Sequence, residues 1–291
     1  MPQPQLHVTV IRHGETNSNL NHILQGQIDT KMNRTGMEQA ESVGRRLRKL
    51  KIDHIYTSDL IRAKKTANAI AKHHPDTPLS TDMRIRERDF GRLSGLSIHD
   101  ALDLIKNEGL TWDDYGEPEE DFKARVVDFF NDIVATHLPR NSNELPLDSK
   151  QPGKRRNPHI VIVAHGGTIN RLVKQHVIMD LGFHVNDYLS MKHKAKNTSV
   201  TKFVVRRKKT GDDLSNIIGI DDDDATSVVS SDSNNSMKDD DNNSEKAMNS
   251  RRDIERKIRL EGEVGLWSCV SHLSSIGKRT HGDSQIDEFV H

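Results

Sequence analysis

The most informative segment of this sequence lies near its start and reads Leu6-His7-Val8-Thr9-Val10-Ile11-Arg12-His13-Gly14. Its first six residues are rich in β-branched side chains, which is typical of a buried strand. Gly14 lacks a side chain, so the backbone can turn sharply where this strand ends. Ligands of open parallel sheets bind beyond the carboxyl ends of the strands. Arg12 and His13 therefore occupy a position where a binding site is expected.

Strand-like and helix-like segments alternate along the rest of the chain. A capping box at Thr35 and Glu38 and a cap at Asp59 are expected to start the first two helices. Met37 belongs to the predicted apolar stripe of the first helix. The alternation predicts an α/β fold with three layers, α/β/α, and a mostly parallel central sheet. Besides residues 6–11, strands are expected at 52–57, 159–164 and 198–206, and helices at 35–50, 59–73, 97–107, 119–138 and 168–179.

Two polar segments interrupt this pattern. Residues 139–158 are long for a connection inside a domain, so we expect a flexible insertion. Residues 209–255 are rich in Asp, Ser and Asn, which predicts a disordered acidic insertion. Residues 262–270 look like a strand that pairs with 198–206, although an unpaired tail is the alternative. The predicted organisation is one domain from 1–208 plus about 258–275, with a flexible tail at 276–291.

Composition excludes several classes of protein. Of 291 residues, 43 are Lys or Arg and 43 are Asp or Glu, so no charge excess favours nucleic acid or a membrane surface. Cys269 is the single cysteine, which excludes an internal disulfide framework and fits a reducing compartment. No signal segment or membrane-spanning apolar run is visible. We expect a cytoplasmic protein, with nuclear access left open because Lys154-Arg155-Arg156 is either a localisation signal or an ordinary loop.

Three further segments carry side chains that suit phosphate chemistry. Arg62 follows the second strand at the start of a helix, on the same rim as His13. His165 ends a buried strand and precedes Gly166, just as His13 precedes glycine. Glu87 lies among arginines. One interpretation is that it only forms ion pairs with them, and the other is that it donates a proton to a leaving group. An imidazole can attack phosphorus, and arginine can grip phosphate oxygens with two hydrogen bonds.

Together these segments resemble the histidine phosphatase superfamily, also called phosphoglycerate mutase-like. The resemblance rests on Arg12-His13-Gly14-Glu15-Thr16 and extends over about 1–206 plus the late strand. It implies that His13 is the phosphorylated nucleophile, that Glu87 is the acid and base, and that no metal or cofactor takes part. It also implies a set of phosphate- and substrate-binding residues: Arg12, Gly14, Asn17, Gln25, Gly26, Arg62, His165 and Gly166.

The resemblance is strongest to the TIGAR-type fructose-2,6-bisphosphatases, through Ile23-Leu24-Gln25-Gly26-Gln27 and Arg86-Glu87-Arg88-Asp89-Phe90-Gly91. It implies hydrolysis of a small phosphorylated metabolite, of the sugar bisphosphate or phosphoglycerate class. Mutase chemistry is less favoured, because residues 95–121 lack the arginine- and proline-rich lid of the mutases. A protein phosphatase or a scaffold, with the acidic tract as its added feature, is the third hypothesis. The substrate loop departs from the family at Gly116-Glu117-Pro118, where a hydroxyl residue is common.

Overall fold

The structure, a computed structural model, describes residues 3–148, 151–186, 192–208 and 259–274. The chain divides into one unit of residues 1–206 and 262–291 and another of residues 207–261. The second unit lies almost wholly outside the described residues, as do the predicted acidic insertion and the predicted tail. The predicted domain boundaries therefore stay predictions. All that follows concerns the first unit and the strand residues that adjoin it.

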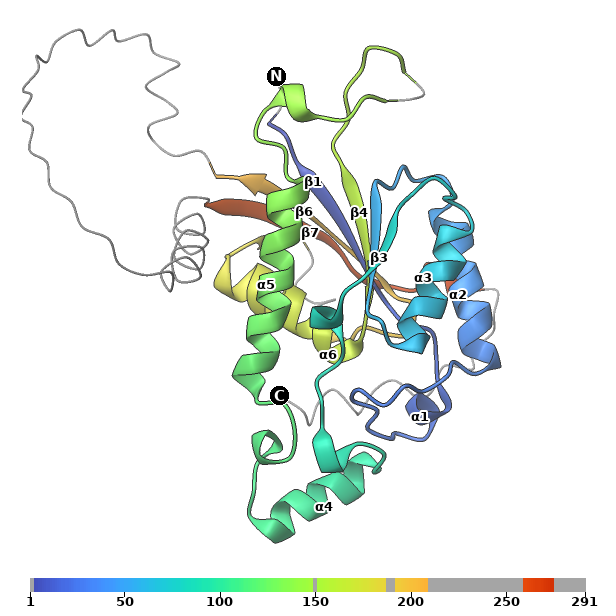
Figure 1. Cartoon of the computed structure of the whole chain (residues 1–291), viewed down its shortest axis with the longest axis vertical. Coiled ribbons are helices and arrows are strands. Elements are labelled where there is room, and N and C mark those ends of the chain that lie inside the picture. The colour runs from blue at the N-terminus through green and yellow to red at the C-terminus, as the bar shows by residue number, and fades with distance from the viewer. Residues whose placement is uncertain (1–2, 149–150, 187–191, 209–258, 275–291) are drawn as a thin grey trace, which may run out of the picture. The chain divides into compact units, whose positions relative to one another are not determined.

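A seven-stranded mixed sheet forms the centre of the molecule, with the strand order β3-β2-β4-β1-β6-β7-β5 (Figure 1). β1 pairs with β4, β4 with β2, and β2 with β3, all in parallel, whereas β6 runs antiparallel to β1. The expected mostly parallel sheet is confirmed. The strands are β1 (Leu6–Arg12), β2 (His54–Thr57), β3 (Leu79–Thr81), β4 (His159–Ala164), β5 (His184–Val185), β6 (Val200–Arg207) and β7 (Leu260–Cys269).

Helices cover both faces of this sheet, which confirms the three-layer prediction. α2 (Arg34–Leu47) and α3 (Ile61–Ala71) lie on one side, and α5 (Glu119–His137) and α6 (Gly166–Ile169) on the other (Figure 1). A π-helix (Asn170–Asp180) continues α6. α1 (Asn17–Leu20) and α4 (Ile98–Glu108) lie beyond the carboxyl ends of the parallel strands. Short 3-10 turns occupy Met83–Ile85, Gly91–Leu93, Trp112–Asp114, Ser142–Glu144 and Ser271–Leu273.

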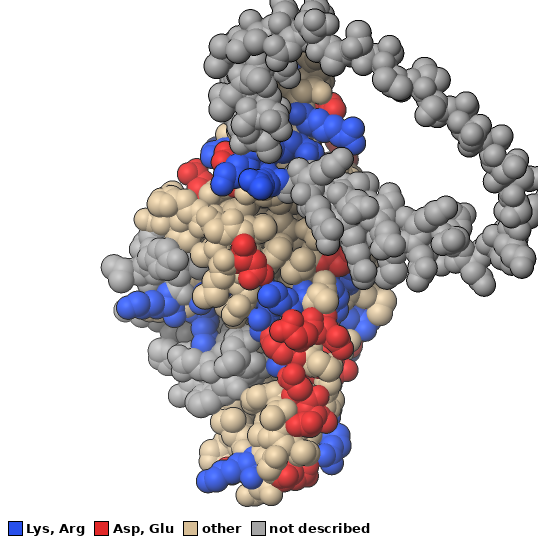
Figure 2. Space-filling view, turned by 90° about the vertical axis from the view of Figure 1, so that its left-hand side faces the viewer, with Lys and Arg blue, Asp and Glu red and all other residues tan. Residues whose placement is uncertain are grey.

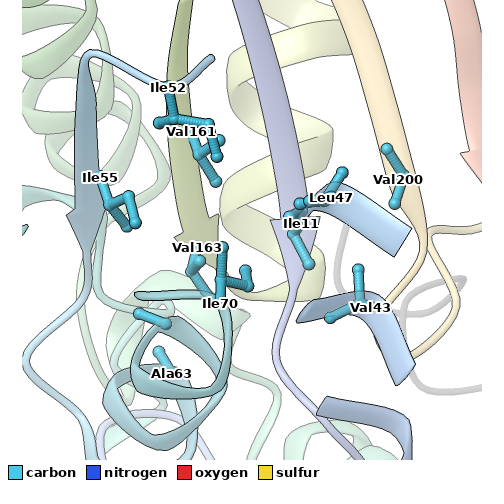
Figure 3. Close-up of a cluster of buried hydrophobic side chains, with 11 residues drawn as sticks. Ile11, Val43, Leu47, Ile52, Ile55, Ala63, Ile70, Val161, Val163 and Val200 are labelled. Carbon is cyan, nitrogen blue, oxygen red and sulfur yellow. The ribbon is translucent and has the colours of Figure 1, made fainter. Parts of the chain in front are cut away.

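The core explains why β1 and β4 are apolar along their whole length. On one face Ile11 of β1 and Val163 of β4 belong to the same buried cluster as Leu47 of α2 and Ile70 of α3 (Figure 3). On the other face α5 contributes three fully buried phenylalanines, of which Phe130 lies 6.4 Å from the ring of Phe203. A parallel strand buried on both faces needs such a continuous apolar run.

Two of the expected helix starts are wrong. α2 begins at Arg34, and Asn33 caps it by accepting the N–H of Gly36 at 2.8 Å. Asparagine is a stronger cap than threonine. Met37 is 42% exposed and does not belong to the buried stripe of this helix, so that prediction is also wrong. α3 has Leu60 at its cap position, without a side-chain hydrogen bond. Asp59 instead pairs with Arg86.

The late strand is found where it was expected. β7 lies beside β6, and the N–H of Ser268 donates to Thr201 Oγ1 at 3.1 Å. The described part of 139–158 is held by an isolated bridge between Leu147 and Arg155 and by the Arg156–Asp53 ion pair. Flexibility of this segment stays a prediction.

The surface charge is mixed. On the face in Figure 2, Asp and Glu side chains form a streak over the lower half, and Lys and Arg form several separate groups. No helix among the described residues is long and apolar enough to cross a membrane.

Candidate active site

Two histidines meet where β1 and β4 end. The parallel register places Arg12 beside Ala164, and the N–H of His13 donates to the carbonyl of Ala164 at 3.0 Å. His13 and His165 are therefore neighbours, with ring centroids 5.2 Å apart. Both side chains are buried. The sheet thus brings together the two residues that the sequence placed at strand ends.

The hydrogen bonding of His13 determines its tautomer. Nδ1 lies 2.8 Å from the carbonyl oxygen of Gly14. A carbonyl can only accept, so Nδ1 carries the proton in the neutral ring and Nε2 keeps its lone pair. Gly14 itself has no room for a side chain, because a Cβ there would lie 2.4 Å from the carbonyl oxygen of Gly36. The close approach of this loop to α2 therefore requires glycine.

The surroundings keep both rings neutral. Burial lowers the pKa of His13 well below its ordinary value of 6.5, and the charges of Arg62 and Arg12 lower it further. Burial and Arg62 also lower the pKa of His165 well below 6.5. Protonation would place a third positive charge among two arginines in a site shielded from water. Near pH 7, Nε2 of His13 is therefore unprotonated.

Backbone carbonyls hold the two arginines in place. Arg12 Nη1 donates to the carbonyl of Ala195 at 2.8 Å. Arg62 donates to the carbonyls of Ile28 at 2.7 Å and Gly26 at 2.8 Å. Burial lowers the pKa of Arg62 to about 10, which still leaves it charged at neutral pH. These hydrogen bonds to backbone carbonyls fix the direction of both guanidinium groups.

His165 has an unusual feature for a fully buried side chain. Neither of its ring nitrogens has a hydrogen-bond partner among the described residues. A buried polar atom without a partner costs about 1–3 kcal/mol. This arrangement, beside two buried arginines, is typical of a site whose missing partner is a ligand.

Glu87 lies against the start of α6. Its Oε2 accepts the N–H of Gly167 at 3.0 Å, and its Oε1 accepts the N–H of Arg88 at the same distance. A Cβ at Gly167 would lie 2.4 Å from Oε1, so any side chain there would displace the carboxylate. Its charge also raises the pKa of Arg62, so Glu87 lies close enough to act on that arginine.

The comparisons with known proteins agree with this geometry. A family model described as "Histidine phosphatase superfamily (branch 1)" matches residues 8–216. The chain belongs to the histidine phosphatase superfamily. Its family and its phosphatase relatives make it a phosphatase, and therefore a hydrolase.

Two relatives and one solved structure illustrate the similarity. A probable phosphatase of Schizosaccharomyces pombe is 32% identical over 205 residues, which cover 70% of this chain and 89% of the relative. The fructose-2,6-bisphosphatase TIGAR of Xenopus tropicalis is 30% identical, with 68% of this chain and 86% of the relative covered. A phosphoglycerate mutase structure from Bacillus anthracis has a TM-score of 0.53 at 24% identity, covering 69% of this chain and 88% of that one, which supports the fold alone.

The other predicted site residues of this histidine phosphatase surround the same strand ends. Gly26 adopts a φ of +48°, a left-handed conformation that favours glycine, and its carbonyl receives Arg62. Gln25 is buried, and its Oε1 accepts from Thr16 and Thr30. Gly166 begins α6. Asn17 is the first residue of α1 and is exposed. Its predicted phosphate contact stays a prediction.

The sequence analysis missed Arg125, a residue of α5 that supports the Glu87 segment. Arg125 donates to the backbone carbonyls of Arg84, Arg86 and Glu87 at 2.6, 2.9 and 3.0 Å. It also forms a two-point ion pair with Glu117 at 2.5 and 2.7 Å. Glu117 belongs to the loop where the sequence departs from the family. That loop thus acts on Glu87 through Arg125, and no local sequence signal marks this contact.

The arginines that flank Glu87 form ion pairs with carboxylates from other segments of the chain. Arg86 pairs with Asp59, and the buried Arg88 pairs with Asp113 and Glu119. The ion-pairing interpretation of this arginine-rich segment is therefore correct for the arginines. Glu87 accepts hydrogen bonds from the backbone N–H groups of Gly167 and Arg88.

The segment before β6 was also missed. Asn197 Nδ2 donates to the carbonyl of His13 at 2.9 Å, and the N–H of Thr198 donates to that of Arg12 at 3.0 Å. Thr198 has a φ of +53°, which is uncommon for threonine. Together with the Ala195 carbonyl on Arg12, this segment holds the end of β1. Only the antiparallel pairing of β6 with β1 reveals the role.

Proposed function

We propose that this phosphatase hydrolyses small phosphate esters, of the sugar bisphosphate or phosphoglycerate class, through a phosphohistidine on His13. The observation that carries the proposal is the neutral, buried His13 ring with Nε2 unprotonated between two arginines and opposite an unpartnered His165. Such a ring is a nucleophile beside a binding site for an anion.

In the first step Nε2 of His13 attacks phosphorus, and the bond from phosphorus to the ester oxygen breaks. Arg12 and Arg62 neutralise charge on the phosphoryl oxygens, and His165 donates a hydrogen bond to them. Glu87, protonated when the dianionic ester is bound, gives its proton to the leaving oxygen. The products are the free alcohol and phosphohistidine.

In the second step water attacks the phosphohistidine, and Glu87 takes a proton from that water. The bond between phosphorus and Nε2 breaks, which restores His13 and releases inorganic phosphate. The chain's own cations supply the charge stabilisation in both steps, so the proposal includes no metal or cofactor.

The substrate class draws its support from the relatives. TIGAR of Xenopus tropicalis is named as a fructose-2,6-bisphosphatase and covers two thirds of this chain. Ile98 and Ala101 of α4 pack in a small core with Leu24, Phe90 and Leu93, beyond the carboxyl ends of the parallel strands. We further propose that the protein acts on free metabolites in the cytoplasm.

The test is a phosphate-release screen of the full chain beside its His13→Ala variant. The compounds are fructose-2,6-bisphosphate, bisphosphoglycerate, phosphoglycerates, nucleotides and phosphopeptides. Release from a sugar bisphosphate or phosphoglycerate, lost in the variant, is the expected result. Acid-quenched wild-type protein is then examined by mass spectrometry for a phosphoryl group on His13. Isomerised phosphoglycerate without phosphate release would favour a mutase, and release only from phosphopeptides would favour a protein phosphatase.

A further inference from the structure

A cavity lies at the end of β1 and β4 opposite to His13 and His165. Its volume is about 500 Å³, within the usual range for sites that bind small molecules. β1 has seven residues at about 3.3 Å each, so this cavity is about 20 Å from the His13 end. In Figure 1 the start of β1 and the 139–158 segment lie at the same end of the sheet. The side chains that matter here are His7, Lys51, Arg155, Arg156, Asn157 and His159.

The lining is cationic. It contains Lys51, Arg155 and Arg156 and no carboxylate. Asp53 holds Arg156 through two hydrogen bonds of 2.7 and 2.5 Å, and Asp148 pairs with Lys51. These pairs orient two of the cations along the wall. Three cations against two carboxylates leave the cavity positive.

Arg155 carries the excess charge. Its Nη1 donates to the backbone carbonyls of Asn143 and Leu145, both at 2.7 Å. Among the described residues no carboxylate lies within ion-pair distance of its guanidinium. These two neutral acceptors thus fix the direction of the planar Arg155 guanidinium, whose positive charge has no carboxylate partner among the described residues. Such a guanidinium matches the oxygens of a phosphate group.

Burial is the main cause of the lowered pKa values of the two histidines of the wall. Burial lowers the pKa of His7, and Arg206 and Lys202 lower it further. Burial lowers the pKa of His159 to about 4, with His7 and Lys202 adding to the effect. An anion bound beside these rings would favour their protonated forms and raise both pKa values.

We propose that this cavity is a second anion site, which binds a small phosphate ester through Arg155, Lys51 and the paired imidazoles of His7 and His159. The site is separate from the phosphatase chemistry and does not depend on it. The basic segment Lys154-Arg155-Arg156 thereby has a structural role in ligand binding. The volume of about 500 Å³ suits one small molecule.

The test follows the imidazole signals of His7 and His159 by NMR over a pH series. Full-length His13→Ala protein is used, so that esters are not turned over. The ligands are AMP, adenosine as its uncharged match, inorganic phosphate and acetate. AMP is expected to raise the pKa of both histidines, and phosphate is expected to do so more weakly. Because these histidines lie far from His13, the signal separates this cavity from the active site.

A matched pair of arginine variants assigns the effect. Arg155→Gln is expected to weaken AMP binding at this site by about tenfold or more. Arg140→Gln removes an exposed cation of the same segment that does not line the cavity, and it should leave AMP binding unchanged. Lys51→Gln tests the opposite wall in case the loop shifts when Arg155 is replaced. With His13 intact, the Arg155→Gln variant should keep the phosphatase activity of the wild type, which checks that the variant folds.

Several results would overturn the proposal. These are no response of either histidine to AMP, an equal response to adenosine or acetate, or AMP binding no tighter than phosphate. Unchanged AMP binding in both Arg155→Gln and Lys51→Gln would do the same.

Discussion

β1 and β4 carry two histidine pairs, one at each end. His7 lies beside His159 with ring centroids 6.0 Å apart, and His13 lies beside His165 at 5.2 Å. Both pairs are packed with cations nearby, and burial lowers the pKa of all four rings. The residue types and the strands are the same, yet the two ends differ in what surrounds them.

At the start of the strands, His159 Nε2 has Thr9 Oγ1 as a partner at 2.7 Å, and two carboxylates pair with the cations. At the carboxyl ends, His165 has no partner among the described residues, and carbonyls hold the arginines. The backbone N–H groups of Gly14 and Gly167 there donate to Thr66 Oγ1 and to Glu87 Oε2. The surroundings of each pair, rather than the histidines themselves, therefore distinguish the proposed active site from the other end of the sheet.

The largest difference between the pairs is expected in turnover. His13→Ala should lower kcat by roughly 10⁴-fold or more, because no other residue replaces the nucleophile. His7→Ala, in the other pair, should leave kcat nearly unchanged. Phosphate release under saturating substrate measures both. Comparable losses in the two variants would contradict the assignment of chemistry to one end of the sheet.

A smaller loss is expected from displacing Glu87. Gly167→Ala places a methyl group in van der Waals overlap with the carboxylate, so kcat should fall by about 10²-fold. The loss should be larger for alkyl phosphates than for aryl phosphates, whose leaving groups need no proton. Gly265→Ala is the control, since a Cβ there meets only Asn186 Nδ2 at 3.9 Å. Equal losses of kcat for alkyl and aryl phosphates would show that Gly167 does not act on proton transfer to the leaving group.

Arg125 should have a weaker effect of the same kind. Arg125→Gln removes three hydrogen bonds to the backbone around Glu87, and we expect kcat to fall by about tenfold. The loss should again depend on the leaving group, with KM little changed. Arg92→Gln removes an exposed arginine paired with Glu108 and serves as the matched control. A raised KM with unaltered kcat would show that Arg125 acts on substrate binding instead.

The lowered pKa values of His13 and His165 predict a dependence of stability on pH. Unfolded histidines take up protons near pH 6.5, whereas these two folded ones do so only at lower pH. The free energy of unfolding should therefore fall as pH drops below 6.5, by about 1.4 kcal/mol per pH unit for each ring. Urea unfolding of the wild type and of a His13→Asn, His165→Asn variant at several pH values measures this slope. A variant with the wild-type slope would contradict the prediction.

The smallest effect is expected from the acidic tract. Deleting residues 212–250 should leave activity and thermal stability nearly unchanged, because that composition offers little apolar surface to bury. Collapse of the domain would contradict the interpretation of the tract as a loop between β6 and β7.

The sequence by itself determined the fold class and the positions of His13, His165, Arg62 and Glu87 along it. Apolar periodicity and strand-ending glycines are local signals, and they sufficed to place His13, His165 and Arg62 at one edge of a parallel sheet, whereas Glu87 was identified through the family resemblance. The starts of α2 at Arg34 and of α3 at Ile61 were missed, because Asn33 rather than Thr35 caps α2 and Leu60 precedes α3 without a side-chain cap.

Only the tertiary structure decided how the site is held. Arg125 reaches the Glu87 segment from α5, and Asn197 reaches His13 from the segment before β6, both across large separations in sequence. The same is true of the cavity at His7 and His159, whose wall comes from a polar loop. Long-range hydrogen bonds and ion pairs depend on how packed elements meet in space, and no local pattern of residues encodes that meeting.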